Sequence, residues 1–360
     1  MTMLSGKRSL FYIIPVSLFV SLFLLIFAEA ALRMVGFRFD TRPRYMEFNF
    51  PNPHEIHEIF QPDPVTFWRL RPRVRMGDGI EPINSMGFRG PEFSEEKSPG
   101  LKRIITLGDS VTFGGAISYP QLLAGCLDGG WEVINAGVPG YSVVQGWKLY
   151  ENRIAKLKPD VVTIMFGWND HWLARGIPDS QQAVKQSTEA SRPINCLKGL
   201  RIYQLLNYII YHNVRSPSKS APIAYRVPIE EYKNYVERLT DAVKSSGARV
   251  ILITAPSAFE AGKVPVYFLE LGFVQRVEGE NGKDMALRLN RLHASYNDVT
   301  RTVAAEKAVA LVDLDAQWRT KGAAGLFRDP AKDVVHPNEK GYRLIGETLC
   351  DTIKSIRFRQ

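Results

Sequence analysis

The sequence predicts an α/β protein in which a parallel sheet lies between two layers of helices, preceded by one membrane-spanning helix. From Lys102 onward, short apolar runs rich in β-branched residues alternate with longer amphipathic stretches, a pattern typical of a parallel sheet covered on both faces. Residues 9–28 carry no charge and match the roughly 20 apolar residues that cross a bilayer. The 360 residues, 45% of them hydrophobic, can bury one large core, so we expect one main domain with an N-terminal extension.

Residues 1–33 are interpreted as a membrane anchor. Lys7 and Arg8 precede the apolar run and favour a cytoplasmic N-terminus, with the folded domain on the periplasmic or outer face of the membrane. The arginines beyond the run oppose that orientation: Arg33, Arg38, Arg42 and Arg44. A cleaved signal peptide is the alternative, because Ala28-Glu29-Ala30 fits a small-x-small cleavage pattern. The run is longer than the usual apolar region of a signal peptide, which favours the uncleaved, single-pass anchor.

Residues 34–100 contain many prolines and no long helical periodicity, so we expect an extension with a few short strands that packs on the next domain. In the stretch Trp68–Arg75, every second residue is an arginine. On a strand, these four side chains would share one face, either toward solvent or, less commonly, toward a phosphate or carboxylate. The segment Asn84–Gly90 is expected to pack on the main domain.

The main domain is expected to span residues 101–360. The expected strands are Arg103–Leu107, Trp131–Asn135, Asp160–Phe166, Arg249–Thr254 and Ala308–Asp313, and the expected helices are Tyr119–Leu127, Val143–Leu157, Ile229–Ser246, Lys283–Glu306 and Glu339–Ile356. An insertion at 171–228 interrupts this order. Its Leu200–His212 stretch predicts an amphipathic helix that packs in the core, roofs a cleft or touches the membrane.

The net charge of +9 is concentrated in this insertion, which has eight Lys and Arg residues against two Asp and Glu. Such a surface suits anionic lipid headgroups or a polyanionic glycan, and a solvated face is the ordinary alternative. Nucleic acid is not an expected partner, because no binding motif accompanies the charge. The three cysteines, Cys126, Cys196 and Cys350, have no metal-ligand spacing, and we expect them to be unpaired small hydrophobes.

Gly108-Asp109-Ser110 follows the first strand of the main domain, at the sheet edge where α/β proteins bind ligands. A strand-ending turn of these residue types is common, so the motif alone is weak evidence for a nucleophilic serine. Near the C-terminus, Asp333 and His336 offer the orienting carboxylate and the general base that a serine hydroxyl needs. Without the other motifs, the same two residues would be interpreted as a helix cap and a surface histidine.

Four motifs in this order resemble those of the SGNH (GDSL-type) hydrolase superfamily: Gly108-Asp109-Ser110, Gly137, Gly167-x-Asn169-Asp170 and Asp333-x-x-His336. The resemblance covers roughly residues 101–356. It implies a flavodoxin-like, three-layer α/β/α sandwich with five parallel strands, and a catalytic triad of Ser110, His336 and Asp333. The oxyanion donors would be the N–H groups of Ser110 and Gly137 and the amide of Asn169, with Asp109 and Asp170 in supporting roles. Val111 replaces the leucine of the GDSL motif, a change of packing.

The resulting hypothesis is a membrane-anchored serine esterase that needs no cofactor or metal and cleaves O-acyl esters, especially O-acetyl esters, of a cell-envelope or secreted glycan. Its partners would be this acylated glycan, or a lipid, and the membrane through residues 9–28. The alternatives are acyl transfer to a sugar hydroxyl, lysophospholipid or thioester hydrolysis, and a catalytically silent glycan-binding protein. Of the histidines outside the triad, His171 is expected, with Trp172, to line the pocket. The others are expected to be surface or structural: His54, His57, His212 and His293.

Overall fold

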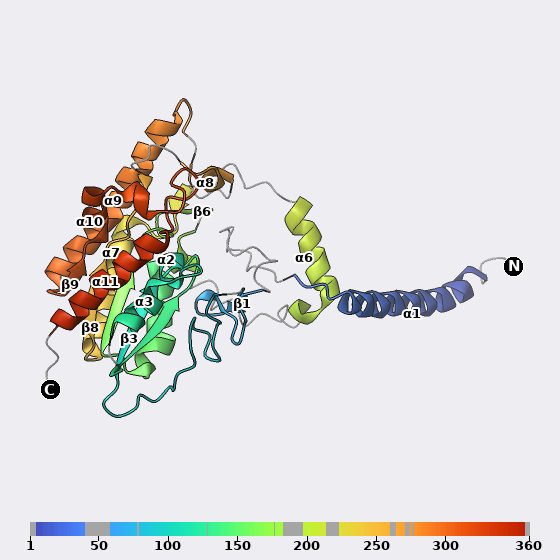
Figure 1. Ribbon diagram of the computed structural model, residues 1–360. Coiled ribbons are helices and arrows are strands. Elements are labelled where there is room, and N and C mark those ends of the chain that lie inside the picture. Colours follow the sequence, from blue (N-terminus) through green and yellow to red (C-terminus); the bar gives the residue numbers. More distant parts are fainter. Residues whose placement is uncertain are drawn as a thin grey trace.

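The computed structural model of the chain describes residues 5–39, 58–77, 79–127, 129–175, 177–182, 197–213, 223–259, 264–270, 274–275 and 277–356. A body of strands and helices carries the C-terminus, and one long helix extends away from it to the N-terminus (Figure 1).

The main sheet confirms the predicted fold. It contains five parallel strands in the order β4-β3-β5-β8-β9. Their bounds are Lys102–Gly108 (β3), Trp131–Gly137 (β4), Val161–Met165 (β5), Arg249–Ile253 (β8) and Ala310–Val312 (β9). All residues of β5 are buried, as expected for a strand covered on both faces. After β4 the chain returns to the other side of β3, so the order reverses between β3 and β5. In such sheets, ligands bind at the carboxyl ends of the strands beside this switch point.

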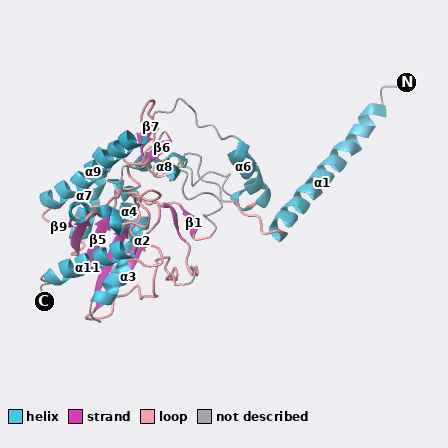
Figure 2. Cartoon of the chain, turned by 45° about the horizontal axis from the view of Figure 1, so that its top comes forward, coloured by secondary structure: helices cyan, strands magenta, loops and turns pink. Residues whose placement is uncertain are grey.

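Helices cover both faces of the sheet (Figures 1 and 2). Their bounds are Ser110–Phe113 (α2), Tyr119–Cys126 (α3), Val143–Leu149 (α4), Ile229–Ser245 (α7), Val266–Glu270 (α8), Gly282–Glu306 (α9), Leu314–Lys321 (α10) and Glu339–Ser355 (α11). Helix α3 packs against α11, while α4 and α9 both pack against α7. Helix α7 forms its inner face from Tyr232, Val236, Leu239 and Val243, which are spaced at three and four residues and are buried. The predicted helix Val143–Leu157 is instead α4 followed by a π-helical turn, Tyr150–Ile154, and a 3-10 turn, Ala155–Leu157. Helix α10 and the 3-10 turn Ala323–Leu326 were not predicted.

Helix α1, Ser5–Met34, extends away from the sheet (Figure 2). Its segment Ile13–Met34 has a mean hydropathy of 2.4 and is long and apolar enough to cross a membrane, by length and composition alone. None of the most apolar window of this segment is buried in the protein. This is the surface expected of a lipid-facing helix, and a signal sequence has the same composition.

In the extension, the antiparallel strands β1, Phe60–Asp63, and β2, Phe67–Leu70, form a hairpin. Trp68 is fully buried, and its indole N–H donates to the Pro139 carbonyl oxygen at 3.2 Å. The Tyr141 hydroxyl donates to the Trp68 carbonyl oxygen at 2.5 Å. The hairpin therefore packs on the loop that follows β4.

The four alternating arginines of Trp68–Arg75 do not share one face of a strand. Strand β2 ends at Leu70, and the chain turns at Arg73, whose φ of 60° lies in the left-handed region. A residue in that region interrupts an extended strand, so Arg69 alone of the four lies in β2. Its Nε lies 3.4 Å from Oδ2 of Asp63 across the hairpin.

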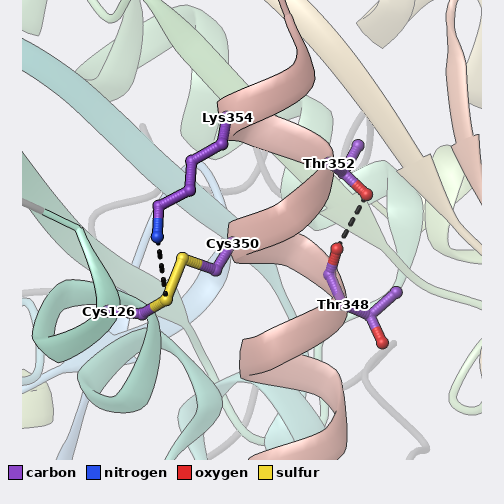
Figure 3. Close-up of a disulfide and its surroundings, with 5 residues drawn as sticks. All are labelled: Cys126, Thr348, Cys350, Thr352 and Lys354. Carbon is purple, nitrogen blue, oxygen red and sulfur yellow. Dashed lines mark hydrogen bonds between the residues drawn. A yellow bond between two sulfur atoms is a disulfide. The ribbon is translucent and has the colours of Figure 1, made fainter.

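The prediction of unpaired cysteines is wrong for two of the three. Cys126, the last residue of α3, and Cys350, in α11, form a disulfide (Figure 3). They are 224 residues apart, and the packing of α3 against α11 brings their Cα atoms to 6.3 Å. Cys350 is buried and Cys126 is exposed. The Lys354 ammonium lies 3.7 Å from the Cys126 sulfur. Cys196 lies outside the described residues.

The insertion contributes an antiparallel pair, β6 (Leu173–Arg175) with β7 (Ile223–Tyr225), and the helix α6 (Arg201–Asn213). Helix α6 lies away from the sheet, beside the C-terminal end of α1 (Figures 1 and 2). Of the eight basic residues in the insertion, Arg226 is buried in an ion pair with Asp179 and cannot belong to a basic surface.

Candidate active site

Ser110 follows β3 at the carboxyl edge of the sheet, beside the switch point. A Cβ at Gly108 would lie 2.7 Å from the Met165 carbonyl oxygen of β5, so the close approach of these strands requires glycine. Asp109 caps α2, because its Oδ1 accepts the Val111 N–H at 2.9 Å. Ser110 is therefore held at the first position of a short helix, and its residue remains partly exposed.

The structure brings Ser110, His336 and Asp333 together in one hydrogen-bonded chain. His336 Nε2 lies 2.8 Å from Ser110 Oγ, and His336 Nδ1 lies 2.8 Å from Asp333 Oδ2. Burial alone would raise the pKa of Asp333. The hydrogen bond and charge of His336, with the N–H groups of Val335 and His336, outweigh burial and lower that pKa below its usual value. An ionised Asp333 only accepts, so it orients Nδ1 as the donor and leaves Nε2 to accept the Ser110 proton.

Buried neighbours fix the loop that carries Asp333 and His336. Val334 and Val335 are buried, and the Val334 carbonyl oxygen accepts the Ala258 N–H at 3.1 Å. After the loop, Asn338 caps α11 by accepting the Gly341 N–H at 3.0 Å. The position of the imidazole is thus set on both sides by packed structure.

Asn169 is buried and joins the three loops that follow β3, β4 and β5. Its Nδ2 donates to Asp109 Oδ2 at 3.0 Å and to the Tyr141 carbonyl oxygen at 3.1 Å. Both hydrogens of this amide are therefore engaged within the protein. Burial raises the pKa of Asp109 to about 6, against the lowering effects of the Val111 N–H, His336 and Asn169.

Gly137, a predicted oxyanion donor, is engaged elsewhere. Its N–H donates to Asn135 Oδ1 at 3.0 Å. A Cβ at position 137 would lie 2.2 Å from the backbone nitrogen of Phe113, so this glycine permits the close packing of α2 against β4.

Gly140 was not singled out from the sequence. It has a φ of 81°, and the Tyr141 N–H donates to the Val138 carbonyl oxygen at 3.1 Å, which closes a tight turn. Within the described part of the chain, the N–H groups of Gly140 and Ser110 donate to no acceptor. The Pro139-Gly140 pair could have indicated this turn, because proline and glycine are favoured at its two central positions.

Asp170 links the loops after β4 and β5. Its two carboxylate oxygens accept the N–H groups of Val143, at 2.8 Å, and Gly167, at 2.9 Å. The side chain is fully buried, and burial raises its pKa to about 7 against the lowering effects of these N–H groups and of Arg226.

Arg226, from the insertion, was also missed by the sequence interpretation. Its Nη1 donates to the Gly140 carbonyl oxygen at 2.7 Å, and its Nη2 donates to Asp179 Oδ2 at 2.7 Å and to Gln145 Oε1 at 2.7 Å. The buried guanidinium therefore fixes the turn at Gly140. No local motif marks such a residue, because its partners are 47 to 86 residues away.

His171 and His293 form a buried pair away from the triad. His293 Nε2 donates to the Ala255 carbonyl oxygen at 2.7 Å, so its Nδ1 accepts from His171 Nε2 at 3.0 Å. Burial lowers the pKa of His293 to about 4 and that of His171 well below its usual value, which keeps both rings neutral. His171 lines a pocket of about 170 Å³ whose walls include β6, β7 and α9 but not Ser110. His54, His57 and the side chain of His212 lie outside the described residues. Within the described ranges, no group of three or more His, Cys, Asp or Glu side chains is placed to hold a metal ion.

Most of the chain is similar to one known protein family. The sequence pattern of the GDSL-like Lipase/Acylhydrolase family matches residues 106–344. Among solved structures, the lipase/acylhydrolase from Enterococcus faecalis is 20% identical, with 72% of this chain and 100% of that chain covered and a TM-score of 0.44. An acetylxylan esterase from Geobacillus stearothermophilus is 20% identical, with 72% and 97% covered and a TM-score of 0.43. None of the curated proteins matches the chain.

Proposed function

The chain belongs to the GDSL-like lipase/acylhydrolase family of serine hydrolases that act on ester bonds, and from this premise we propose that Ser110, His336 and Asp333 are its catalytic triad. The observation that carries the proposal is the pair of 2.8 Å contacts that join Ser110 Oγ to His336 and His336 to Asp333. This arrangement supports acyl transfer through a serine nucleophile.

In the proposed reaction, Ser110 Oγ attacks the acyl carbon while His336 Nε2 takes the hydroxyl proton. Asp333 stabilises the imidazolium, which then protonates the leaving alcohol as the ester bond breaks. A water molecule, deprotonated by His336, attacks the acyl-Ser110 ester and releases the carboxylic acid. Ser110 recovers its proton from His336, so the cycle consumes one water per ester.

We propose the N–H groups of Ser110 and Gly140 as donors to the oxyanion, because both lack an acceptor within the described structure. Asn169 remains in the proposal as a third donor, which requires the N–H bonded to the Tyr141 carbonyl oxygen to be shared with the oxyanion when substrate binds. Gly137 is replaced by Gly140, since the Gly137 N–H is taken by Asn135. Each donor of this kind is worth roughly 3 kcal/mol of transition-state stabilisation in other acyl-transfer enzymes.

The proposed substrates are O-acyl esters, especially O-acetyl esters, on a cell-envelope or secreted glycan. The His336 side chain is 33% exposed and Ser110 is partly exposed, an open site that suits an ester carried on a bulky polymer. The Cys126–Cys350 disulfide supports a location outside the cytoplasm, because such bonds persist in oxidising compartments.

We propose that α1 remains attached as a membrane anchor. Glu29 lies inside the alternative cleavage pattern, and its carboxylate accepts the Ile202 N–H of α6 at 3.0 Å. Cleavage after Ala30 would remove this contact. Mass spectrometry of the mature protein tests the proposal, and an N-terminus at Ala31 would replace the anchor with a signal peptide.

A fluorophosphonate probe tests the nucleophile. Full-length protein should be labelled at Ser110, and Ser110→Ala should abolish labelling and turnover while the protein remains folded. Ser98→Ala, at an exposed position, is the matched control and should change neither. Label on another residue, or undiminished turnover by Ser110→Ala, would contradict the assignment. A panel of acetylated polysaccharides, aryl acetates and lysophospholipids then tests the substrate class, and activity on lysophospholipids alone would reject the glycan.

A further inference from the structure

The exposed face of helix α6 is apolar, and a glutamine on its opposite face is buried. Leu206, Ile209 and Ile210 are exposed at 54%, 44% and 55%, while Gln204 is only 5% exposed. The buried Gln204 Oε1 accepts the Phe39 N–H at 3.2 Å. In water, a surface helix turns its apolar stripe inward and its polar residues outward. The reversed arrangement is the one expected of a helix that meets an apolar surrounding.

Hydrogen bonds join the first turn of α6, and a residue shortly before it, to the last turns of α1. Glu29 Oε2 accepts the Ile202 N–H at 3.0 Å, so a carboxylate of α1 satisfies one of the free N–H groups at the N-terminus of α6. Arg33 Nη2 donates to the Gly199 carbonyl oxygen at 3.2 Å, directly before α6. Both α1 residues lie in the C-terminal part of the segment that is long enough to span a membrane.

Two further contacts hold α6 beside the residues that directly follow α1. The Tyr208 ring packs edge-on against Phe37, with centroids 6.0 Å apart, and against Phe39, with centroids 5.5 Å apart. These phenylalanines follow Met34, the end of α1. Helix α6 is thus held where a spanning α1 would leave the apolar layer, and both views show it beside that end of α1 (Figures 1 and 2).

The charges around this junction have one dominant sign. Residues 29–39 and 197–213 contain one acidic residue, Glu29, against four basic ones: Arg33, Arg38, Lys198 and Arg201. Glu29 is already paired with Arg33 at 2.7 Å. Basic residues next to an exposed apolar helix face match the anionic headgroups that cover the acyl region of a bilayer.

We propose that α6 is an interfacial helix whose apolar face, Leu206, Ile209 and Ile210, lies in the membrane leaflet from which α1 emerges. The occupant of this face is the acyl and headgroup region of an anionic bilayer. The proposal rests on α1 as a spanning anchor and is independent of the chemistry of Ser110. A second attachment of this kind would restrict rotation of the chain about α1.

Site-directed spin labelling of the full-length chain tests the proposal in vesicles of phosphatidylcholine and phosphatidylglycerol. A Cys196→Ser background leaves only the two disulfide-bonded cysteines, so one nitroxide can be attached at Leu206→Cys or Ile210→Cys. Leu287→Cys in α9, where the native leucine is 50% exposed, is the matched control outside the junction, and Leu22→Cys reports on α1. Far-UV circular dichroism of each labelled protein shows that it is folded.

We expect nitroxides at positions 206, 210 and 22 to collide more often with oxygen, which concentrates in the bilayer, than with a water-soluble nickel reagent. The nitroxide at position 287 should show the reverse. If the nitroxides at 206 and 210 are exposed to water while the one at 22 is exposed to lipid, the proposal is overturned and the membrane anchor is retained. An aqueous label at 22 would overturn both. Labels at 206 and 210 shielded from both reagents would overturn the proposal in favour of protein covering the face, from a second copy or another part of the chain.

Discussion

His336 makes two hydrogen bonds with different consequences for the reaction. Oδ1 of Asp333 already accepts the N–H groups of Val335 and His336, at 2.9 and 3.0 Å, so Oδ2 is the oxygen left for the imidazole. In Asp333→Asn, the amide oxygen would keep the two backbone bonds and the NH2 group would face His336 Nδ1. The imidazole would then carry its proton on Nε2, where it cannot accept the proton of Ser110.

We therefore expect Asp333→Asn to lower kcat by about 10⁴-fold, as in other serine triads with the equivalent change, with little effect on folding. Steady-state kinetics on an aryl ester together with thermal unfolding measures both quantities. Asp351→Asn, at an exposed position of α11, is the control and should leave kcat unchanged. A loss below tenfold would make Asp333 auxiliary, and near-normal turnover by His336→Ala would reject the triad.

At this scale, the sequence singled out the three residues that the structure joins by hydrogen bonds, and it did not single out Gly140 and Arg226, whose surroundings depend on hydrogen bonding. Ser110, Asp333 and His336 are recognisable because their chemistry is specific to their side chains. The contribution of Gly137 or Gly140 depends on whether the backbone N–H is free, and only the Asn135 side chain decides that. The buried role of Arg226 depends on contacts with other segments, which its neighbours in the sequence do not reveal.

At the scale of elements, the five strands of the main sheet were predicted well because their signal is local. The strand ends differ from the predicted ones by no more than two residues, since burial on both faces of a central strand produces a short continuous apolar run. The disulfide could not be predicted in this way, because it depends on the packing of α3 against α11 across 224 residues.

Asp170 connects two of these elements, and its titration gives a prediction about stability. Its pKa is raised from 3.8 to about 7 in the folded protein, so the folded state holds the proton more tightly than the unfolded state between these values. This contribution to stability is present at low pH and is lost as the pH rises through about 7. The loss is at most about 1.4 kcal/mol per pH unit for one proton.

Asp170→Asn removes this titration. The amide would also direct an N–H toward the N–H of Val143 or Gly167, a mismatch that costs roughly 1–3 kcal/mol in a buried site. We expect the variant to be less stable than the wild type by urea unfolding, with a difference that narrows as the pH rises from about 4 to 7. Parallel stability curves for the two proteins would contradict the raised pKa.

At the scale of the whole molecule, separate parts of the chain converge on the turn at Gly140. The N-terminal hairpin reaches it through Trp68, which donates to Pro139. The insertion reaches it through Arg226, which donates to Gly140. The loop after β5 reaches it through Asn169, which donates to Tyr141. The proposed oxyanion donor is thus positioned by the extension and the insertion as well as by the sheet.

The disulfide encloses most of the main domain in one covalent loop, because it joins α3, near the start of that domain, to α11, near its end. A cross-link over 224 residues restricts the unfolded chain strongly, and native bonds of this kind typically contribute about 2–5 kcal/mol to folding stability. Cys126→Ser/Cys350→Ser should lose stability by about that amount in urea unfolding.

A reductant provides the matched control for this last prediction. Because Cys126 is exposed, dithiothreitol should reach the bond in the wild type and lower its stability to that of the double variant. The double variant has no bond to reduce and should not respond. Equal loss in both proteins would assign the effect of the reductant to another site, and equal stability of the two proteins without reductant would show that the cross-link does not stabilise the fold. Wild-type protein retained in a reducing cytoplasm should therefore behave as the double variant does.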